Sequence, residues 1–183
     1  MKRTYPRSRG LALSATLAAL ISICALISIP LPFTPVPVTL QVLGVYLAAS
    51  LLGPIYGALS CLIYVMLGAV GLPVFAGATS GVGVLLGPLG GYLVSCPVAA
   101  LAAGSISRSR SVTRRRDATR VFVSCLVSMA VIYAIGVTWL ALYLHIGLYA
   151  ATLLGLVPFV PLDALKALVA VPIACGGHWR GEE

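Results

Sequence analysis

Asp163 and Lys166 are the two residues of this sequence whose type and spacing most clearly suggest chemistry. They lie three residues apart in a segment that otherwise carries no charge from residue 121 to residue 179. On a helix, this spacing places both side chains on one face. Together they offer an anionic acceptor and a cationic donor, which suits a small ligand that has N–H groups and a carbonyl or carboxylate. An internal ion pair that fixes the helix is the structural alternative.

Few other polar side chains qualify for such a site. Gln41 follows a proline-rich segment, and Tyr92 and Tyr133 lie near expected helix ends or midpoints. Trp139, Tyr143 and His145 fit the interface between membrane and water better than a ligand site. The sequence has no cluster of His, Cys and carboxylate residues, no phosphate-binding loop and no evident nucleophile–base pair. We therefore expect no metal, no cofactor and no enzymatic activity.

The composition indicates that this chain is embedded in a lipid bilayer. Hydrophobic residues make up 60% of the 183 residues and charged residues 9%, with a mean hydropathy of +1.07, whereas soluble domains carry about 25% charged residues. The length allows one domain, so we expect residues 1–183 to form a single transmembrane domain. Within a membrane-spanning helix, each charge costs about 2.5–3.5 kcal/mol at the bilayer centre, and charges that remain there usually mark a substrate path.

The basic residues are concentrated in two short clusters, and residues 11–107 contain no Asp, Glu, Lys or Arg. The clusters lie in a tail at 1–9 and a loop at 108–118. Basic residues beside apolar spans indicate the cytoplasmic side, so the net charge of +8 does not predict binding to nucleic acid. A span needs about 20 apolar residues, which allows about four spans between the clusters and two after them. We expect an all-α bundle of six transmembrane helices with both termini in the cytoplasm.

The expected helices are separated by glycine and proline. A signal peptide is the alternative for the first apolar segment, but the run over 11–29 is longer than such peptides require, so we expect a retained helix. Residues 145–156 either extend the fifth helix or form a short surface helix, and the sixth helix starts at Pro158 or Pro161. The expected helices cover residues 10–29, 40–52, 56–70, 92–107, 119–144 and 158–176.

Two uncharged segments are expected to form outer loops. Residues 30–39 contain four prolines, and residues 71–91 are rich in glycine and proline, with Thr79 and Ser80 as polar members. Both are too apolar for ordinary solvated loops. Irregular backbone at membrane depth must be sheltered from lipid, so we expect these loops to lie against the protein or to cover a cavity.

Small residues on the first helix permit close approach by another helix. Ala15 and Ala19 are four residues apart, a spacing that serves packing within this protein or docking of a partner. The five cysteines are widely spaced and form no C-x-x-C motif. We expect them to be free thiols that pack as small hydrophobic side chains.

Several ordered motifs over residues 10–175 resemble the BioY family, the biotin-binding S components of energy-coupling factor transporters. They are PVPVTLQ at 35–41, LLGP at 51–54, GAVGLPVFAG at 68–77, GPLGGY at 87–92 and PFVPLDALK at 158–166. The resemblance implies six transmembrane helices, cytoplasmic termini and capture of biotin from outside under the first and third loops. It also implies that Asp163 and Lys166 bind the ligand. Ala15 and Ala19 would pack against a membrane coupling subunit that two ATPase subunits drive.

The resemblance adds further expectations for the ligand site. Thr79, Ser80, Tyr92 and Gln41 are candidate hydrogen-bonding groups, and Phe33 and Phe75 are candidates to cover the bicyclic ring and tail of biotin. The sequence leaves open whether Lys166 meets the ureido carbonyl or the carboxylate of biotin.

Three positions depart from the family pattern. Ile55 replaces a usual basic residue, Leu89 a usual threonine and Leu162 a usual glycine, and we expect the last two to affect the pocket. The expected protein is a multi-pass subunit of the cell membrane for biotin uptake. The alternatives are a stand-alone biotin carrier, an S component for another vitamin or metabolite, and a membrane enzyme that uses Asp163 as acid or base.

Overall fold

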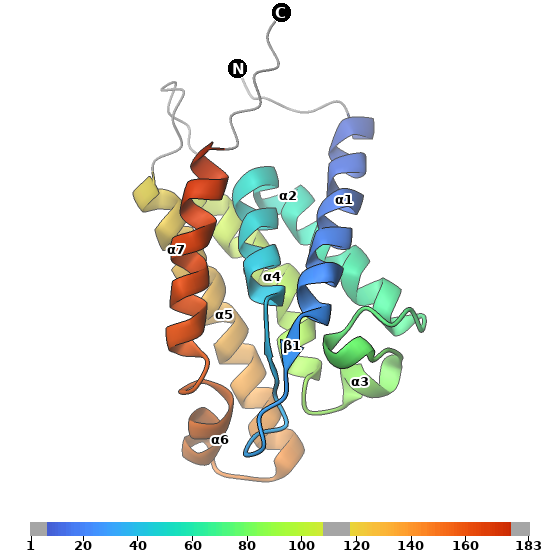
Figure 1. Ribbon diagram of the computed structural model, residues 1–183, viewed down its shortest axis with the longest axis vertical. Helices are drawn as coiled ribbons and strands as arrows, with labels where there is room; N and C mark the ends of the chain where they lie inside the picture. The colour runs from blue at the N-terminus through green and yellow to red at the C-terminus, as the bar shows by residue number, and fades with distance from the viewer. Residues whose placement is uncertain (1–6, 108–117, 177–183) are drawn as a thin grey trace, which may run out of the picture.

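The computed structural model describes residues 7–107 and 118–176, and these form a helical bundle with one short hairpin (Figure 1). The basic loop expected at 108–118 and most of the basic tail expected at 1–9 lie outside the described residues. The elements, in chain order, are α1 (Arg7–Leu26), β1 (Ser28–Ile29), β2 (Val38–Thr39), α2 (Gln41–Ala69), the 3₁₀ helix η1 (Ala76–Ala78), α3 (Val82–Leu86), α4 (Gly90–Ser107), α5 (Ala118–Leu144), α6 (Leu148–Gly155) and α7 (Val160–Gly176).

The all-α membrane architecture is confirmed. Within the described residues, four helices are long and apolar enough to cross a membrane, namely α1, α2, α4 and α5. A fifth span arises if α6 and α7, which meet at a bend of 50°, count as one broken span. The expected number of six spans stays a prediction, and it depends on how α2 is divided.

The helix α2 is broken at Gly53, where the sequence predicts a turn. Gly53 has φ 77° and ψ −170°, a backbone conformation that glycine adopts without steric cost, and Pro54 follows without an N–H to continue the helix. Beyond the break, a Cβ at Gly57 would lie 2.9 Å from the carbonyl oxygen of Ala48. In a straight helix these two residues would be about 13.5 Å apart along the axis. The two halves of α2 therefore fold back on each other as a helical hairpin.

The centre of the bundle is built on small residues. The helix α4 packs against both α2 and α5, and α1 packs against α2. Several alanines are fully buried at these contacts, among them Ala48, Ala49, Ala99, Ala100 and Ala103. Small residues permit close approach of helices in a membrane, where lipid supplies no hydrophobic force to drive them together. Many large apolar side chains, such as Ile23, Leu142 and Leu168, are exposed on the outside.

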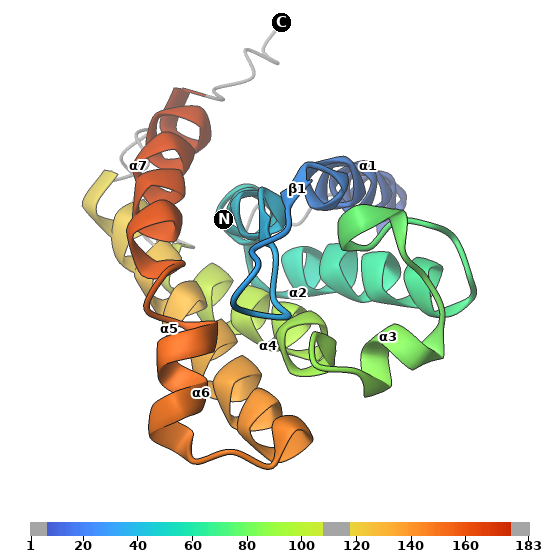
Figure 2. The ribbon, with the colours of Figure 1, turned by 60° about the horizontal axis from the view of Figure 1, so that its bottom comes forward.

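One end of the bundle carries the irregular structure that the sequence predicts for the outer side. The start of α1 and the end of α7 lie together at one end, and the loop between β1 and β2, the α3 segment and α6 lie at the other (Figures 1 and 2). The described ends of the chain thus lie at the same end of the bundle, and the side of the membrane on which the basic segments lie stays a prediction.

The two outer loops are ordered by contacts with the helices and with each other. The proline loop, residues 30–37, is closed by antiparallel pairing of Ser28 with Thr39 and of Ile29 with Val38. The glycine loop, residues 70–89, is fixed by Phe75, which is fully buried and packs edge-on against Tyr64 with 5.5 Å between ring centroids. The Gly77 N–H donates to Ser28 Oγ at 3.0 Å. This bond joins the two loops.

Residues 145–156, which the sequence leaves ambiguous, form a separate short helix. His145 has φ 53° and interrupts the helical conformation after α5, and α6 then runs from Leu148 to Gly155. The helix α7 begins at Val160 with Pro161 in its first turn, one of the two predicted starts. The cysteines of the described residues are free, and all but Cys175 are buried, as expected.

Candidate functional site

The charged pair lies near the start of α7, at the end of the bundle that carries the two loops. Asp163 is in the first turn of α7, where the positive end of the helix dipole favours a carboxylate. Lys166 follows one turn later on the same face, and its Nζ lies 2.6 Å from Asp163 Oδ1. The exposed fractions are only 4% for Asp163 and 9% for Lys166. Both side chains therefore lie on one face of α7, as the spacing predicts, and they form the buried ion pair that the structural alternative expects.

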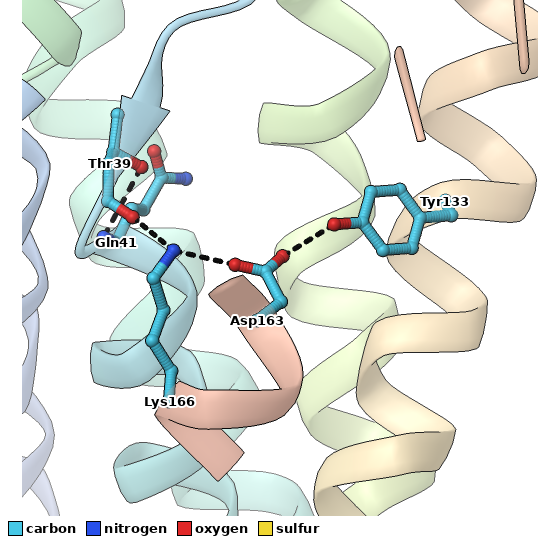
Figure 3. Close-up of polar contacts among 5 residues, drawn as sticks. All are labelled: Thr39, Gln41, Tyr133, Asp163 and Lys166. Carbon is cyan, nitrogen blue, oxygen red and sulfur yellow. Dashed lines mark hydrogen bonds and ion pairs between the residues drawn. The ribbon is translucent and has the colours of Figure 1, made fainter. Parts of the chain in front are cut away.

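Two further groups form hydrogen bonds with the pair (Figure 3). Tyr133 from α5 donates its hydroxyl to Asp163 Oδ2 at 2.6 Å, and Lys166 donates to the carbonyl oxygen of Thr39 at 2.5 Å. Each carboxylate oxygen thus accepts one charge-assisted hydrogen bond. The ammonium group has three donors, and two of them are used. The third N–H of Lys166 therefore has no hydrogen-bond partner among the described residues.

These four residues tie together three parts of the chain that are distant in sequence. Tyr133 comes from α5, Asp163 and Lys166 from α7, and Thr39 from the end of the proline loop. The Thr39 hydroxyl also accepts from the backbone N–H of Gln41 at 3.3 Å, which connects β2 to the start of α2. We call the group Tyr133, Asp163, Lys166 and Thr39 the polar cluster.

The polar cluster forms part of the wall of an internal cavity of about 70 Å³, which we call the inner cavity. Most of its lining is apolar, as is usual for small-molecule sites with a few oriented polar groups. The lining residues are Val36, Pro37, Thr39, Gln41, Val42, Phe75, Ala76, Leu89, Tyr92, Leu93, Cys96, Ile132, Tyr133, Gly155, Phe159, Asp163 and Lys166.

A second, more open cavity of about 500 Å³ lies between the proline loop and the glycine loop. We call it the outer hollow. Pro37, Ala76 and Leu89 border both spaces. The outer hollow is therefore adjacent to the inner cavity, on the side of the loop end of the bundle.

The structure brings five of the eight predicted ligand-site residues together at the inner cavity. These are Asp163, Lys166, Gln41, Tyr92 and Phe75. The Tyr92 hydroxyl donates to the Gly155 carbonyl oxygen at 2.9 Å, and Gln41 Nε2 donates to Cys96 Sγ at 3.4 Å. Both polar groups are thus already oriented by contacts within the protein.

The other three predicted residues lie elsewhere. Thr79 borders the outer hollow, and its hydroxyl donates to the Ala76 carbonyl oxygen at 2.9 Å. Phe33 is 58% exposed, and neither Phe33 nor Ser80 lines either space. The aromatic side chain that the proline loop was expected to place over the ligand therefore points away from the inner cavity.

Tyr133, Cys96 and Phe159 also line the inner cavity, although they are not among the eight predicted ligand-site residues. Tyr133 lies well inside a long apolar helix, and a buried phenol there requires a hydrogen-bond partner. The sequence therefore contained a signal for Tyr133, because Asp163 is the one carboxylate in an apolar span and could accept the hydrogen bond of a buried phenol. Cys96 and Phe159 carry no comparable signal, since an apolar wall can be built from many positions.

The departures from the family pattern have different surroundings. Leu89 lies at the boundary between the inner cavity and the outer hollow, and it makes this boundary apolar. Leu162 is exposed and lines neither space, and Ile55 is exposed just after the break in α2. Only Leu89 is therefore in a position to affect the pocket directly.

Ala15 and Ala19 lie on the outward face of α1. Both are exposed, whereas their neighbours Ser14, Leu17 and Ala18 are buried. The two alanines therefore do not serve packing within the described part of this chain. Their side of α1 is left for lipid or for another protein.

The described residues contain no group of three His, Cys, Asp or Glu side chains that could hold a metal ion. The donor set of the polar cluster, with one carboxylate, one ammonium, one phenol and one carbonyl, matches an organic ligand that both donates and accepts hydrogen bonds.

Comparison with known proteins agrees with this arrangement. The sequence model of the BioY family matches residues 1–181. The chain is 42% identical to a probable biotin transporter BioY of Pyrococcus horikoshii over 92% of this chain and 95% of that protein. It is also 42% identical to a biotin transporter BioY of Thermotoga maritima, over 91% and 94%. The fold matches the crystal structure of the S-component for biotin from an ECF-type ABC transporter with a TM-score of 0.83 and 31% identity, covering 92% of this chain and 89% of that one.

Proposed function

This chain belongs to the BioY family, and from that membership we propose that it is the biotin-binding membrane subunit of an uptake system. It is a multi-pass membrane protein. Its role is to capture biotin from the outer side of the cell membrane and to carry it, without covalent chemistry. The observation that supports this role best is the buried polar cluster, which faces an otherwise apolar cavity beneath two outer loops.

The geometry of the pair favours the ureido end of biotin as the group that it binds. A cyclic urea presents a carbonyl oxygen and an N–H side by side. Lys166 Nζ and Asp163 Oδ1 present a donor and an acceptor side by side, 2.6 Å apart. The free N–H of Lys166 would donate to the ureido carbonyl, while Asp163 or the Tyr133 oxygen would accept from a ureido N–H.

The carboxylate of biotin fits the same position poorly. A carboxylate that approached Lys166 would also lie beside the Asp163 carboxylate, and like charges at that distance repel. The described residues around the inner cavity include no second cation that would compensate this repulsion. We therefore assign the ureido ring to the inner cavity and direct the valerate tail toward the loops.

The same proposal includes a partner surface on α1. The exposed pair Ala15 and Ala19 forms a smooth strip, and the nearby Thr16 hydroxyl is turned back onto the Ala12 carbonyl oxygen at 3.0 Å. A strip of this kind suits close packing of a second transmembrane helix. We propose that a membrane coupling subunit, driven by two ATPase subunits, docks there.

Binding of labelled biotin to the purified full-length protein tests the proposal. We expect saturable binding by the parent, and binding weakened about 10- to 100-fold or more by Asp163→Asn and by Lys166→Gln, since each removes a hydrogen bond to a charged group. Thr138→Ala is the matched control on the exposed side of α5, where the hydroxyl contacts only its own helix at the Ala134 carbonyl oxygen.

Each outcome of this experiment has a distinct meaning. If the parent binds no biotin but binds another vitamin, the substrate assignment is wrong while the site remains. If both variants bind biotin as well as the parent does, the pair is a structural ion pair, and the ligand lies elsewhere.

A further inference from the structure

The outer hollow and the inner cavity differ in their chemistry. No Asp, Glu, Lys, Arg or His is present among the described residues that line the outer hollow. Its polar side chains are Ser28, Thr34, Thr79 and Tyr143, and the rest are glycine, proline or apolar residues. Among the described residues that line the two spaces, charge is therefore confined to the inner cavity.

Three hydroxyl groups of the outer hollow already have partners within the protein. Ser28 Oγ accepts from the Gly77 N–H at 3.0 Å, and Thr79 Oγ1 donates to the Ala76 carbonyl oxygen. Thr34 Oγ1 accepts from the Val36 N–H at 3.3 Å. These bonds hold the loops in place. Only Thr79 donates its O–H in these bonds, so the hollow offers a carboxylate no positive charge and only neutral hydroxyl donors, which can serve an amide carbonyl as well.

The volumes of the two spaces indicate which part of the ligand each space can hold. Small-molecule pockets usually measure about 300–1,000 Å³, so the inner cavity of about 70 Å³ holds only part of a biotin-sized molecule. The outer hollow of about 500 Å³ has room for roughly 16 water-sized groups at about 30 Å³ each. The valerate tail of biotin has about seven heavy atoms of comparable size. It would therefore fill less than half of the outer hollow.

We propose that this protein recognises the ureido end of its ligand and admits biotin derivatives whose carboxylate has been converted into an amide. The largest derivative of this class that the hollow should accept is of the size of biotin joined to the ε-amino group of lysine. An amide lacks the negative charge of the tail, and the outer hollow contains no counter-charge whose loss would weaken binding. The inference rests on the proposed function, because it takes biotin as the parent ligand.

The test compares four compounds for binding to the purified full-length protein by titration calorimetry. They are biotin, biotin amide, ε-N-biotinyl-lysine and a biotin derivative substituted on a ureido nitrogen. We expect both amides to bind within about tenfold of biotin. The ureido-substituted compound should bind at least about tenfold more weakly, since it loses a hydrogen bond to a charged group.

A substitution at Gly83 tests where the added group lies. Gly83 borders the outer hollow, and a Cβ built there meets nothing within 4 Å, so Gly83→Trp places a large side chain at the border of the hollow without a clash at its Cβ. We expect this variant to weaken the binding of ε-N-biotinyl-lysine at least about tenfold more than it weakens the binding of biotin. Gly147→Trp is the matched control, because a Cβ built at Gly147 also meets nothing within 4 Å and Gly147 lines neither space, and it should leave both affinities unchanged.

The outcomes separate this inference from the proposed function. If the parent protein binds no biotin, the proposed function fails. If biotin binds and either amide binds more than about tenfold more weakly, the inference alone is overturned, because the carboxylate is then recognised directly. Equal weakening of biotin and ε-N-biotinyl-lysine by Gly83→Trp also overturns it, since the added lysine would then not occupy the hollow.

Discussion

Removing one charge from the buried pair should cost more stability than removing both. Lys166→Gln leaves Asp163 buried, with Tyr133 as its remaining donor. Breaking a buried ion pair by deleting one partner costs about 3–5 kcal/mol, because an uncompensated charge remains. The double variant Asp163→Asn with Lys166→Gln leaves two neutral amides in the same place, and its cost should be smaller than the cost of either single change.

The size of this difference follows from the contacts of the pair. The distance of 2.6 Å between Nζ and Oδ1 and the low exposure of both side chains imply a coupling energy near the upper part of the range of about 0.5–3 kcal/mol for residues in contact. Because the double variant should cost less than either single variant, the summed cost of the two single variants should exceed the cost of the double variant by at least about 3 kcal/mol.

The assay is unfolding of the detergent-purified full-length protein, followed for the parent, both single variants and the double variant. Biotin binding is measured on the same samples, and we expect the double variant to recover stability without recovering affinity. If the costs of the two single variants simply add in the double variant, the pair does not interact in the folded protein. If the double variant binds biotin like the parent, the polar cluster is not the ligand site.

Three further changes test other parts of the structure. Tyr133→Phe removes the bond to Asp163 Oδ2 and should weaken biotin binding by about tenfold or more in equilibrium titration, whereas Tyr143→Phe at the rim should have little effect. Trp139→Phe removes the 2.9 Å bond from Nε1 to the Gly87 carbonyl oxygen and should speed biotin dissociation in stopped-flow measurements, and an unchanged rate would show that this bond does not hold the glycine loop. Ala15→Trp should abolish co-purification with the coupling subunit while biotin affinity stays within about twofold, and loss of both would indicate a folding defect instead.

The sequence predicted the helices well, because their boundaries are set by local physics. Proline and glycine ended the helices where expected, most clearly at Gly53 and near Pro161. The long uncharged runs required lipid as solvent whatever the tertiary arrangement. The span count was harder to predict, since α2 reverses within one helical segment and α6 and α7 meet at a bend of 50°.

The site was predictable where charge made it so and less so elsewhere. Asp163 and Lys166 were conspicuous because charge is rare in an apolar span. Tyr133 and the Thr39 carbonyl oxygen contact them only because α5 and the proline loop pack beside α7, and that packing connects residues up to 127 positions apart. Phe33 and Phe75 looked equivalent in the sequence, yet only Phe75 is buried, since it packs against Tyr64 and the close approach at Gly68.

The bond from Lys166 to the Thr39 carbonyl oxygen gives the proline loop a thermodynamic link to the ligand. The lysine that would hold the cargo also holds the end of that loop at 2.5 Å, so one side chain takes part in two equilibria. Linkage is reciprocal. The free energy by which the bound ligand stabilises the strand pair β1–β2 equals the free energy by which that strand pair stabilises the bound ligand. Substitutions in residues 30–37 that do not contact the ligand should therefore change the rate at which the ligand dissociates. Ligand binding should likewise change the conformational equilibrium of the proline loop at the outer surface.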